Sequence, residues 1–131
     1  MATQTQALAQ TLVNDKTVEV READADVDTQ IELKHNDRLV FSATGTIWSG
    51  VVLTQRWGPD GAPRFANDPS FPLVGAHKFC LLSKADGQYE EIGKGAEVVY
   101  TGKGSRLFLR INDDHPGNGN GAFDCRIQQF R

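Results

Sequence analysis

The chain has 131 residues, of which 39% are hydrophobic and 24% are charged, and its formal net charge is -3 at pH 7. This length fits one domain with a buried core, and the composition is that of an ordinary globular protein rather than a disordered or fibrous one. The 14 basic residues are scattered among 17 acidic ones, which argues against nucleic acid as a partner, because phosphate contacts need clustered Lys and Arg.

The first segment, residues 1–15, is rich in Gln, Ala and Thr and is predicted to be an N-terminal arm, with a β-sandwich domain over 16–131. It lacks the basic and continuous apolar regions of a signal peptide, and no stretch approaches the roughly 18 apolar residues of a membrane span. We therefore expect no membrane span, and a protein that is cytoplasmic or released without a classical signal peptide.

Beyond Lys16 the apolar residues alternate with polar ones, which is the period of half-buried β-strands. The expected strands lie around residues 18–20, 31–33, 39–43, 47–53, 79–82, 97–100, 107–111 and 123–127. The breaks carry turn residues, among them HND, WGPDGAP, ADG and GKG. The pattern predicts an all-β fold, a jelly-roll-like antiparallel β-sandwich in a single domain.

One connection, residues 56–76, is unusually long and holds four of the five prolines of the chain. Loops longer than about 12–15 residues without secondary structure are uncommon and tend to be functional. The alternative is a proline-stiffened cover over one end of the sandwich.

The two cysteines, Cys80 and Cys125, lie in the apolar runs KFCLL and AFDCRI. We expect buried free thiols rather than a disulfide, and no zinc site, because neither cysteine has a second Cys or His nearby at ligand spacing. The motifs of nucleophilic, zinc-dependent or nucleotide-dependent enzymes are absent from the sequence. His35 and His77 are expected to be loop histidines without a catalytic role, and the protein is not expected to be an enzyme.

The segment NDDHPGNGNG, residues 112–121, has the composition of a calcium loop. Calcium takes six to eight oxygens from carboxylates, amides and carbonyls, and glycines let a loop turn its carbonyls inward. The candidate groups are the carboxylates of Asp113 and Asp114, the amides of Asn118 and Asn120, and the turns at Gly117, Gly119 and Gly121. The pattern is not an EF-hand, and an ordinary hairpin loop uses the same residue types.

Several local motifs of the chain resemble those of the bacterial galactose-specific, calcium-dependent lectins, the galactophilic lectins of pseudomonads. QRWGPDG at 55–61 is close to the Q-K-W-G-P-Q-G of that family, and IND at 111–113 is followed by a Pro-Gly turn, an Asn and G-x-F. Weaker matches are the A-x-G of 43–45 and the Phe-Cys pair at 79–80. The resemblance implies a jelly-roll-like sandwich, often tetrameric, with one calcium per subunit that contacts two sugar hydroxyls.

The resemblance also implies which residues form the site. The calcium ligands would be Asp113, Asn118, a carbonyl near Ser49, and a loop carbonyl of either His115 or Gly117. The second Asn of the family falls on Gly119, which has no side-chain oxygen, so Asn120 is the expected substitute. The residues expected to contact the sugar are Asp113, Asp114, Asn118, Asp68, Phe71 and Trp57, and Trp57 has a competing role as a core plug at the base of the loop.

The function expected from the sequence is that of a bacterial calcium-dependent carbohydrate-binding lectin, of galactoside type or altered specificity, acting as a homo-oligomer. The specificity stays open because Asp68 and Phe71 stand where the family has a sugar-contacting His and Gln. The alternative is an interaction or structural module of the same fold that has lost calcium and sugar binding.

Overall fold

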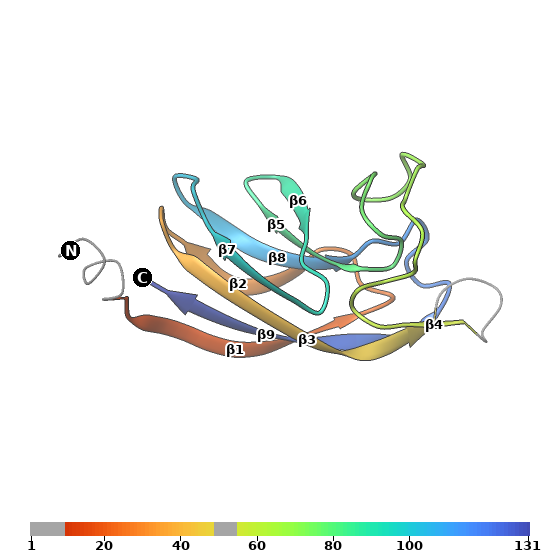
Figure 1. Ribbon diagram of the computed structural model, residues 1–131, viewed down its shortest axis with the longest axis horizontal. Coiled ribbons are helices and arrows are strands. Elements are labelled where there is room, and N and C mark those ends of the chain that lie inside the picture. The colour runs from red at the N-terminus through yellow and green to blue at the C-terminus, as the bar shows by residue number, and fades with distance from the viewer. Residues whose placement is uncertain (1–9, 49–54) are drawn as a thin grey trace.

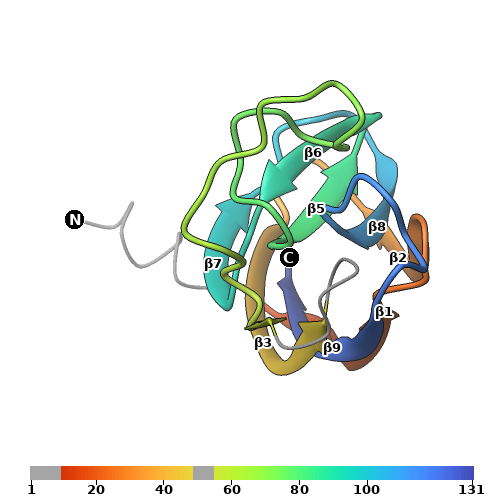
Figure 2. The same ribbon diagram turned by 90° about the vertical axis from the view of Figure 1, so that its right-hand side faces the viewer.

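The computed structural model describes residues 10–48 and 55–131, and this part of the chain forms two antiparallel β-sheets packed face to face (Figures 1 and 2). No helix long and apolar enough to cross a membrane occurs in these residues. The strands are β1 (Leu12–Arg21), β2 (Val27–Leu33), β3 (Arg38–Trp48), β4 (Arg56–Trp57), β5 (Leu81–Ala85), β6 (Gln88–Glu91), β7 (Gly95–Val99), β8 (Ser105–Ile111) and β9 (Asn120–Phe130).

The first sheet has the order β1-β9-β3-β4, with β7 also paired to β3, and the second has the order β2-β8-β5-β6. All strand pairs are antiparallel. The pairs β3-β4 and β5-β6 are consecutive in the chain, but other neighbours are distant, so that β9, the last strand, lies between β1 and β3. The predicted all-β sandwich in a single domain is therefore confirmed.

Several elements differ from the sequence expectation. The two-residue strand β4 lies at the start of the connection 56–76, where no strand was expected. The strand β3 runs unbroken from Arg38 to Trp48, where two strands were expected, because β9 pairs with it along its whole length. The strand β6 was not predicted, since QYEE is short and polar. The strand β1 begins at Leu12, ahead of the expected boundary at Lys16, and the second half of the predicted strand 47–53 lies outside the described residues.

The alternating apolar residues of both sheets meet in one core. On β8 and β9 the inward side chains are Leu107, Leu109, Ile111, Phe123, Cys125 and Ile127, each at most 1% exposed. Cys80 and Cys125 are both buried and free, as expected. Burial raises the pKa of the Cys80 thiol and raises that of Cys125 to about 12, so neither is a reactive thiolate near neutral pH.

Gly45 lies in β3 with a φ of 112°, a conformation that side chains rarely adopt, opposite Phe123 of β9. A Cβ at this position would overlap the carbonyl oxygen of Ala122. We therefore expect Gly45→Ala to lower the free energy of unfolding by about 2 kcal/mol or more. Urea denaturation tests this, with Gly58→Ala as the control, because a Cβ at Gly58 meets nothing within 4 Å; equal stability of the two variants would contradict it.

The long proline-rich loop is fastened to the end of β8 by Asn112, which is fully buried. Its side-chain oxygen accepts from the amide of Leu73 (3.0 Å), and its side-chain nitrogen donates to the carbonyls of Leu73 (3.1 Å) and His77 (3.0 Å). These bonds hold the proline-rich loop and the segment 112–121 at the same end of the sandwich, on the right of Figure 1.

Candidate functional site

The carboxylate of Asp113 is buried at the start of the loop between β8 and β9, although an aspartate is usually exposed. It is only 1% exposed. Its Oδ1 accepts a hydrogen bond from the amide of His115 (3.0 Å), whereas its Oδ2 is buried without any hydrogen-bond partner among the described residues. Such an orphaned oxygen costs about 1–3 kcal/mol or more unless something outside the chain satisfies it.

A second buried carboxylate, that of Glu22, lies against the same loop. Glu22 follows directly on β1 and is 1% exposed, and its backbone amide donates to the carbonyl of Gly121 (3.0 Å). Its side chain accepts from the amide of Gly117 (3.1 Å to Oε2) and from that of Gly119 (3.1 Å). Nothing in the local sequence VEVREAD separates this glutamate from a surface residue, so its role was not predicted.

The Glu22 carboxylate lowers the acidity of Asp113. Burial, and then the neighbouring Glu22 carboxylate, raise the pKa of Asp113 to about 7, and Asp114 adds to this, while the His115 amide acts in the opposite direction. Two carboxylates that face each other away from water cannot both stay ionised at low cost. The arrangement therefore calls for a proton or a cation between them.

Asn118 completes the cluster from the exposed side of the loop. With its amide nitrogen turned inward, it donates to the carbonyl of His115 (2.8 Å) and to Oε1 of Glu22 (3.1 Å). With its oxygen turned inward, the Asn118 oxygen lies at these distances from the other two oxygens, and none of the three carries a proton to share. Oxygens that share one calcium at about 2.4 Å lie roughly 2.8–3.4 Å apart, so the second arrangement has the spacing of a calcium shell.

A cation at this place would depend on oxygens other than carboxylates. Within residues 10–48 and 55–131, no group of three or more His, Cys, Asp and Glu side chains is arranged to hold a metal ion. The oxygens available beside the two acids are the amide of Asn118 and the carbonyl of His115. This oxygen set is suited to calcium, which accepts amides and carbonyls, and not to zinc.

The other predicted metal ligands are placed differently. The side-chain oxygen of Asn120 accepts from the amide of Gly121 (2.7 Å), so it is engaged within the loop. Gly117 and Gly121 have the positive φ values expected of a wrapped loop, 94° and 97°. Ser49 lies outside the described residues.

The predicted sugar-contacting residues lie around the same end of the molecule. Asp114 is half-buried and pairs with the imidazole of His115 (3.2 Å). Asp68 is exposed, and its pKa is lowered by hydrogen bonds from Ser70 and, to a smaller extent, by the charges of Lys78 and His115. This effect of His115 on Asp68 indicates that the loop 112–121 and the proline-rich loop lie near each other.

The two predicted aromatic platforms are largely covered. Phe71 is 7% exposed, with its ring 6.4 Å from that of Phe79, and half-buried Trp57 stacks on Phe79 at 6.2 Å. The indole nitrogen of Trp57 is buried without a partner among the described residues. In this loop the exposed ring is that of Phe65, 60% exposed and 4.5 Å from His77. Their roles as sugar contacts stay predictions.

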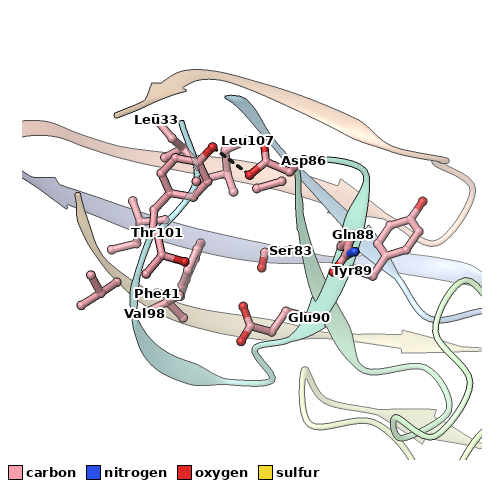
Figure 3. Close-up of a pocket in the computed structure, with 15 residues that line it drawn as sticks. Leu33, Phe41, Ser83, Asp86, Gln88, Tyr89, Glu90, Val98, Thr101 and Leu107 are labelled. Carbon is pink, nitrogen blue, oxygen red and sulfur yellow. Dashed lines mark hydrogen bonds between the residues drawn. The ribbon is translucent and has the colours of Figure 1, made fainter. Parts of the chain in front are cut away.

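A cavity of about 510 Å³ lies elsewhere, lined by residues of β6, of β7 and of neighbouring strands in both sheets. Figure 3 shows Leu33, Phe41 and Leu107 on its walls. Two polar side chains of its lining, Tyr100 and Asp86, are hydrogen-bonded to each other, because the hydroxyl of Tyr100 donates to the Asp86 carboxylate (2.8 Å). The cavity shares no residue with the loop 112–121, and we find no convergent set of free polar groups in it comparable to that around Asp113.

Comparison with known proteins supports the fold. No protein family and no curated protein matches the sequence. Among solved structures, the chain is similar to the EclA N-terminal domain, described as a PllA-like lectin, with a TM-score of 0.65 and 16% sequence identity. The match covers 90% of this chain and 97% of that one, so it extends over the whole sandwich. At this identity the similarity establishes a shared lectin-like fold.

Proposed function

We propose that this protein binds carbohydrate through a calcium ion held by the loop between β8 and β9. The observation that carries the proposal is the buried Oδ2 of Asp113, which has no partner among the described residues and faces a second buried acid. The lectin-like fold supports the same reading, since that loop lies at the end of the sandwich where another loop can join in contacting a ligand. In this proposal the protein binds its ligand and does not act as an enzyme.

The residues that would hold calcium are Asp113, Asn118 and the carbonyl of His115. The position of the Asn118 side chain, 2.8 Å from the His115 carbonyl, favours that carbonyl over the one of Gly117. Asn120 is assigned a lesser role, because its oxygen is already bonded to the next amide. When bound, calcium supplies coordination positions for two neighbouring sugar hydroxyls in place of water.

The side chains at the rim would determine which sugar is held. Asp113 and Asn118 can hydrogen-bond the hydroxyls that approach the ion, and Asp114 is half-exposed beside them. Asp68 adds a negative charge from the facing loop, which would disfavour acidic sugars. We propose neutral saccharides with a vicinal diol, galactosides among them, as the ligand class, and association of several subunits as the source of useful avidity.

A glycan array probed with the labelled protein tests the proposal. Signals on neutral glycans are expected in calcium and are expected to disappear in EDTA, because the hydroxyls lose the ion that orders them. Asp68→Asn should extend binding toward acidic glycans, whereas Asp124→Asn, an exposed change on β9, should alter nothing. Glycan signals that persist unchanged in EDTA would contradict the role of calcium.

The alternative is an interaction module of the same fold without calcium or sugar. Phe65 and Val74 of the proline-rich loop are large apolar side chains that are 60% and 53% exposed, which would suit a protein contact. A melting temperature indifferent to both calcium and chelator, together with an empty glycan array, would select this alternative.

A further inference from the structure

Glu22 is a buried acid that has no basic partner within residues 10–48 and 55–131. None of the ion pairs formed by the described residues involves it. Removing a carboxylate from water costs several kcal/mol in proteins unless it is paired or hydrogen-bonded. The amides of Gly117 and Gly119 offset part of that cost, in the manner of an anion-binding nest.

The other groups near the Glu22 carboxylate are the side chains of Asn118 and Asp113. Oε1 lies 3.1 Å from the end of the Asn118 side chain, which is itself 2.8 Å from the carbonyl of His115. The carboxylate of Asp113, whose Oδ2 is buried without a partner among the described residues, lies within hydrogen-bonding reach of the Glu22 side chain. With the Asn118 oxygen turned inward, two buried carboxylates and two neutral oxygens surround one place, with a combined formal charge of -2 when both acids are ionised.

A divalent cation balances this charge of -2. The loop 112–121 by itself contributes only one of the two buried carboxylates. Asp113 is the buried acid that the loop contributes, since Asp114 is half-exposed and paired with His115. Position 119 is a glycine and adds no side-chain oxygen. The number of charged ligands is one of the properties that determine how tightly an oxygen site binds calcium.

We infer that Glu22, from the end of β1, is the second carboxylate ligand of the calcium site and fixes the loop around the ion through the amides of Gly117 and Gly119. This inference rests on the proposed function. The site then combines residues from two distant parts of the chain. Glu22 follows β1, and Asp113, Asn118 and His115 lie in the connection from β8 to β9.

The test is Glu22→Gln, which keeps the shape of the side chain and an oxygen for the glycine amides but removes the charge. Calcium titration by calorimetry should show binding weakened about tenfold or more. The melting temperature in EDTA should be unchanged or higher, because one of two facing buried acids is gone. The matched control is Glu19→Gln, an exposed glutamate on the same strand, which should behave as wild type.

Europium bound in place of calcium gives a second readout. The luminescence lifetimes in light and heavy water report how many water molecules the ion carries. Loss of the Glu22 ligand should raise that number by about one in Glu22→Gln and leave it unchanged in Glu19→Gln. Should Glu22→Gln fail to fold, Glu22→Asp serves the same test, since it keeps the charge and shortens the reach.

The outcomes separate the two claims. Equal calcium affinity and equal water number in wild type and Glu22→Gln, with a melting temperature lowered alike in calcium and in EDTA, would make Glu22 a structural residue and overturn the inference alone. A wild-type protein that takes up neither calcium nor europium would overturn the proposed calcium site itself.

Discussion

Replacement of Asp113 by asparagine is expected to abolish the rise in melting temperature that calcium produces in the wild-type protein. The variant keeps the size of the side chain but loses the buried charge with the unpaired oxygen. A ligand present at about 100 times its dissociation constant stabilises the folded state by about 2.7 kcal/mol. For a domain of this size, that corresponds to a shift of roughly 10 °C, which differential scanning fluorimetry measures directly.

Without calcium, the stability of Asp113→Asn is expected to be insensitive to a rise in pH that destabilises the wild-type protein. The pKa of Asp113 is raised in the folded state, so the protonated form is favoured there, and the stability it provides is present at pH values below the unfolded pKa of 3.8. This stability is lost as the pH rises through the folded pKa of about 7. In EDTA the wild-type protein should therefore lose stability between about pH 4 and pH 7, and Asp113→Asn should not.

The control for both experiments is Asp124→Asn, an aspartate exposed on β9. It should retain the calcium response and the pH dependence of the wild type. If Asp113→Asn showed the same calcium-induced rise in melting temperature as the wild type, Asp113 would not be a calcium ligand.

Replacement of Asp37 by alanine is expected to be the most destabilising change in the part of the fold remote from the loop 112–121. Asp37 is fully buried in the turn between β2 and β3. It accepts from Arg131 (2.9 and 3.0 Å), from the side chain of Gln129 (2.7 Å) and from the amide of Lys34 (2.7 Å). The change would leave buried donors unsatisfied and lower the free energy of unfolding by about 3 kcal/mol.

The acid sensitivity of the fold should depend on the same group. Burial acts to raise the pKa of Asp37, but the hydrogen bonds from Arg131, Lys34 and Gln129 together outweigh it, so the pKa is lowered from 3.8. Its contribution is therefore present above pH 3.8 and is lost as the pH falls through the lowered folded value. Urea denaturation at pH 7 and at pH 3 should show the difference between wild type and Asp37→Ala shrinking in acid.

A surface pair provides the comparison for Asp37. Asp15 accepts from Arg126 (2.9 and 2.8 Å) on the outside of the sheet formed by β1 and β9. Exposed pairs contribute about 0–1 kcal/mol, so Asp15→Ala should have a small effect at either pH. A loss for Asp15→Ala as large as that for Asp37→Ala would show that burial is not what distinguishes them.

The sequence predicted the sandwich because one face of each strand must be apolar to form the core. Alternation in SRLFLRI and AFDCRI marks β8 and β9, and the turn residues of HND and ADG mark two of the bends. It did not predict β6, which is short and polar, or the continuity of β3 past Gly45. Pairing with β9 determines the length of β3, and a partner more than 70 residues away leaves no mark on the local pattern.

Within the candidate site, composition alone identified the loop 112–121, since Asp, Asn and Gly are needed for an oxygen-lined turn. It indicated Asp113 and Asn118, and the family resemblance added the carbonyl of His115 or of Gly117. The structure places the Asn118 side chain 2.8 Å from the His115 carbonyl, whereas the side chain of Asn120 bonds within the loop. Phe71 and Trp57 were expected near the ligand, and packing against Phe79 leaves Phe71 buried and Trp57 half-buried.

The sequence by itself determined the fold class, the buried free cysteines and the loop that carries the candidate oxygens, because each of these follows from residue types at short spacing. Only the tertiary structure brought Glu22 to Asp113, and only it showed that one oxygen of Asp113 is buried without a partner among the described residues. The physical reason is that the acidity and the ion affinity of a carboxylate depend on what surrounds it in space. In this protein those surroundings come from strands at opposite ends of the chain, β1 and β9, which pair side by side.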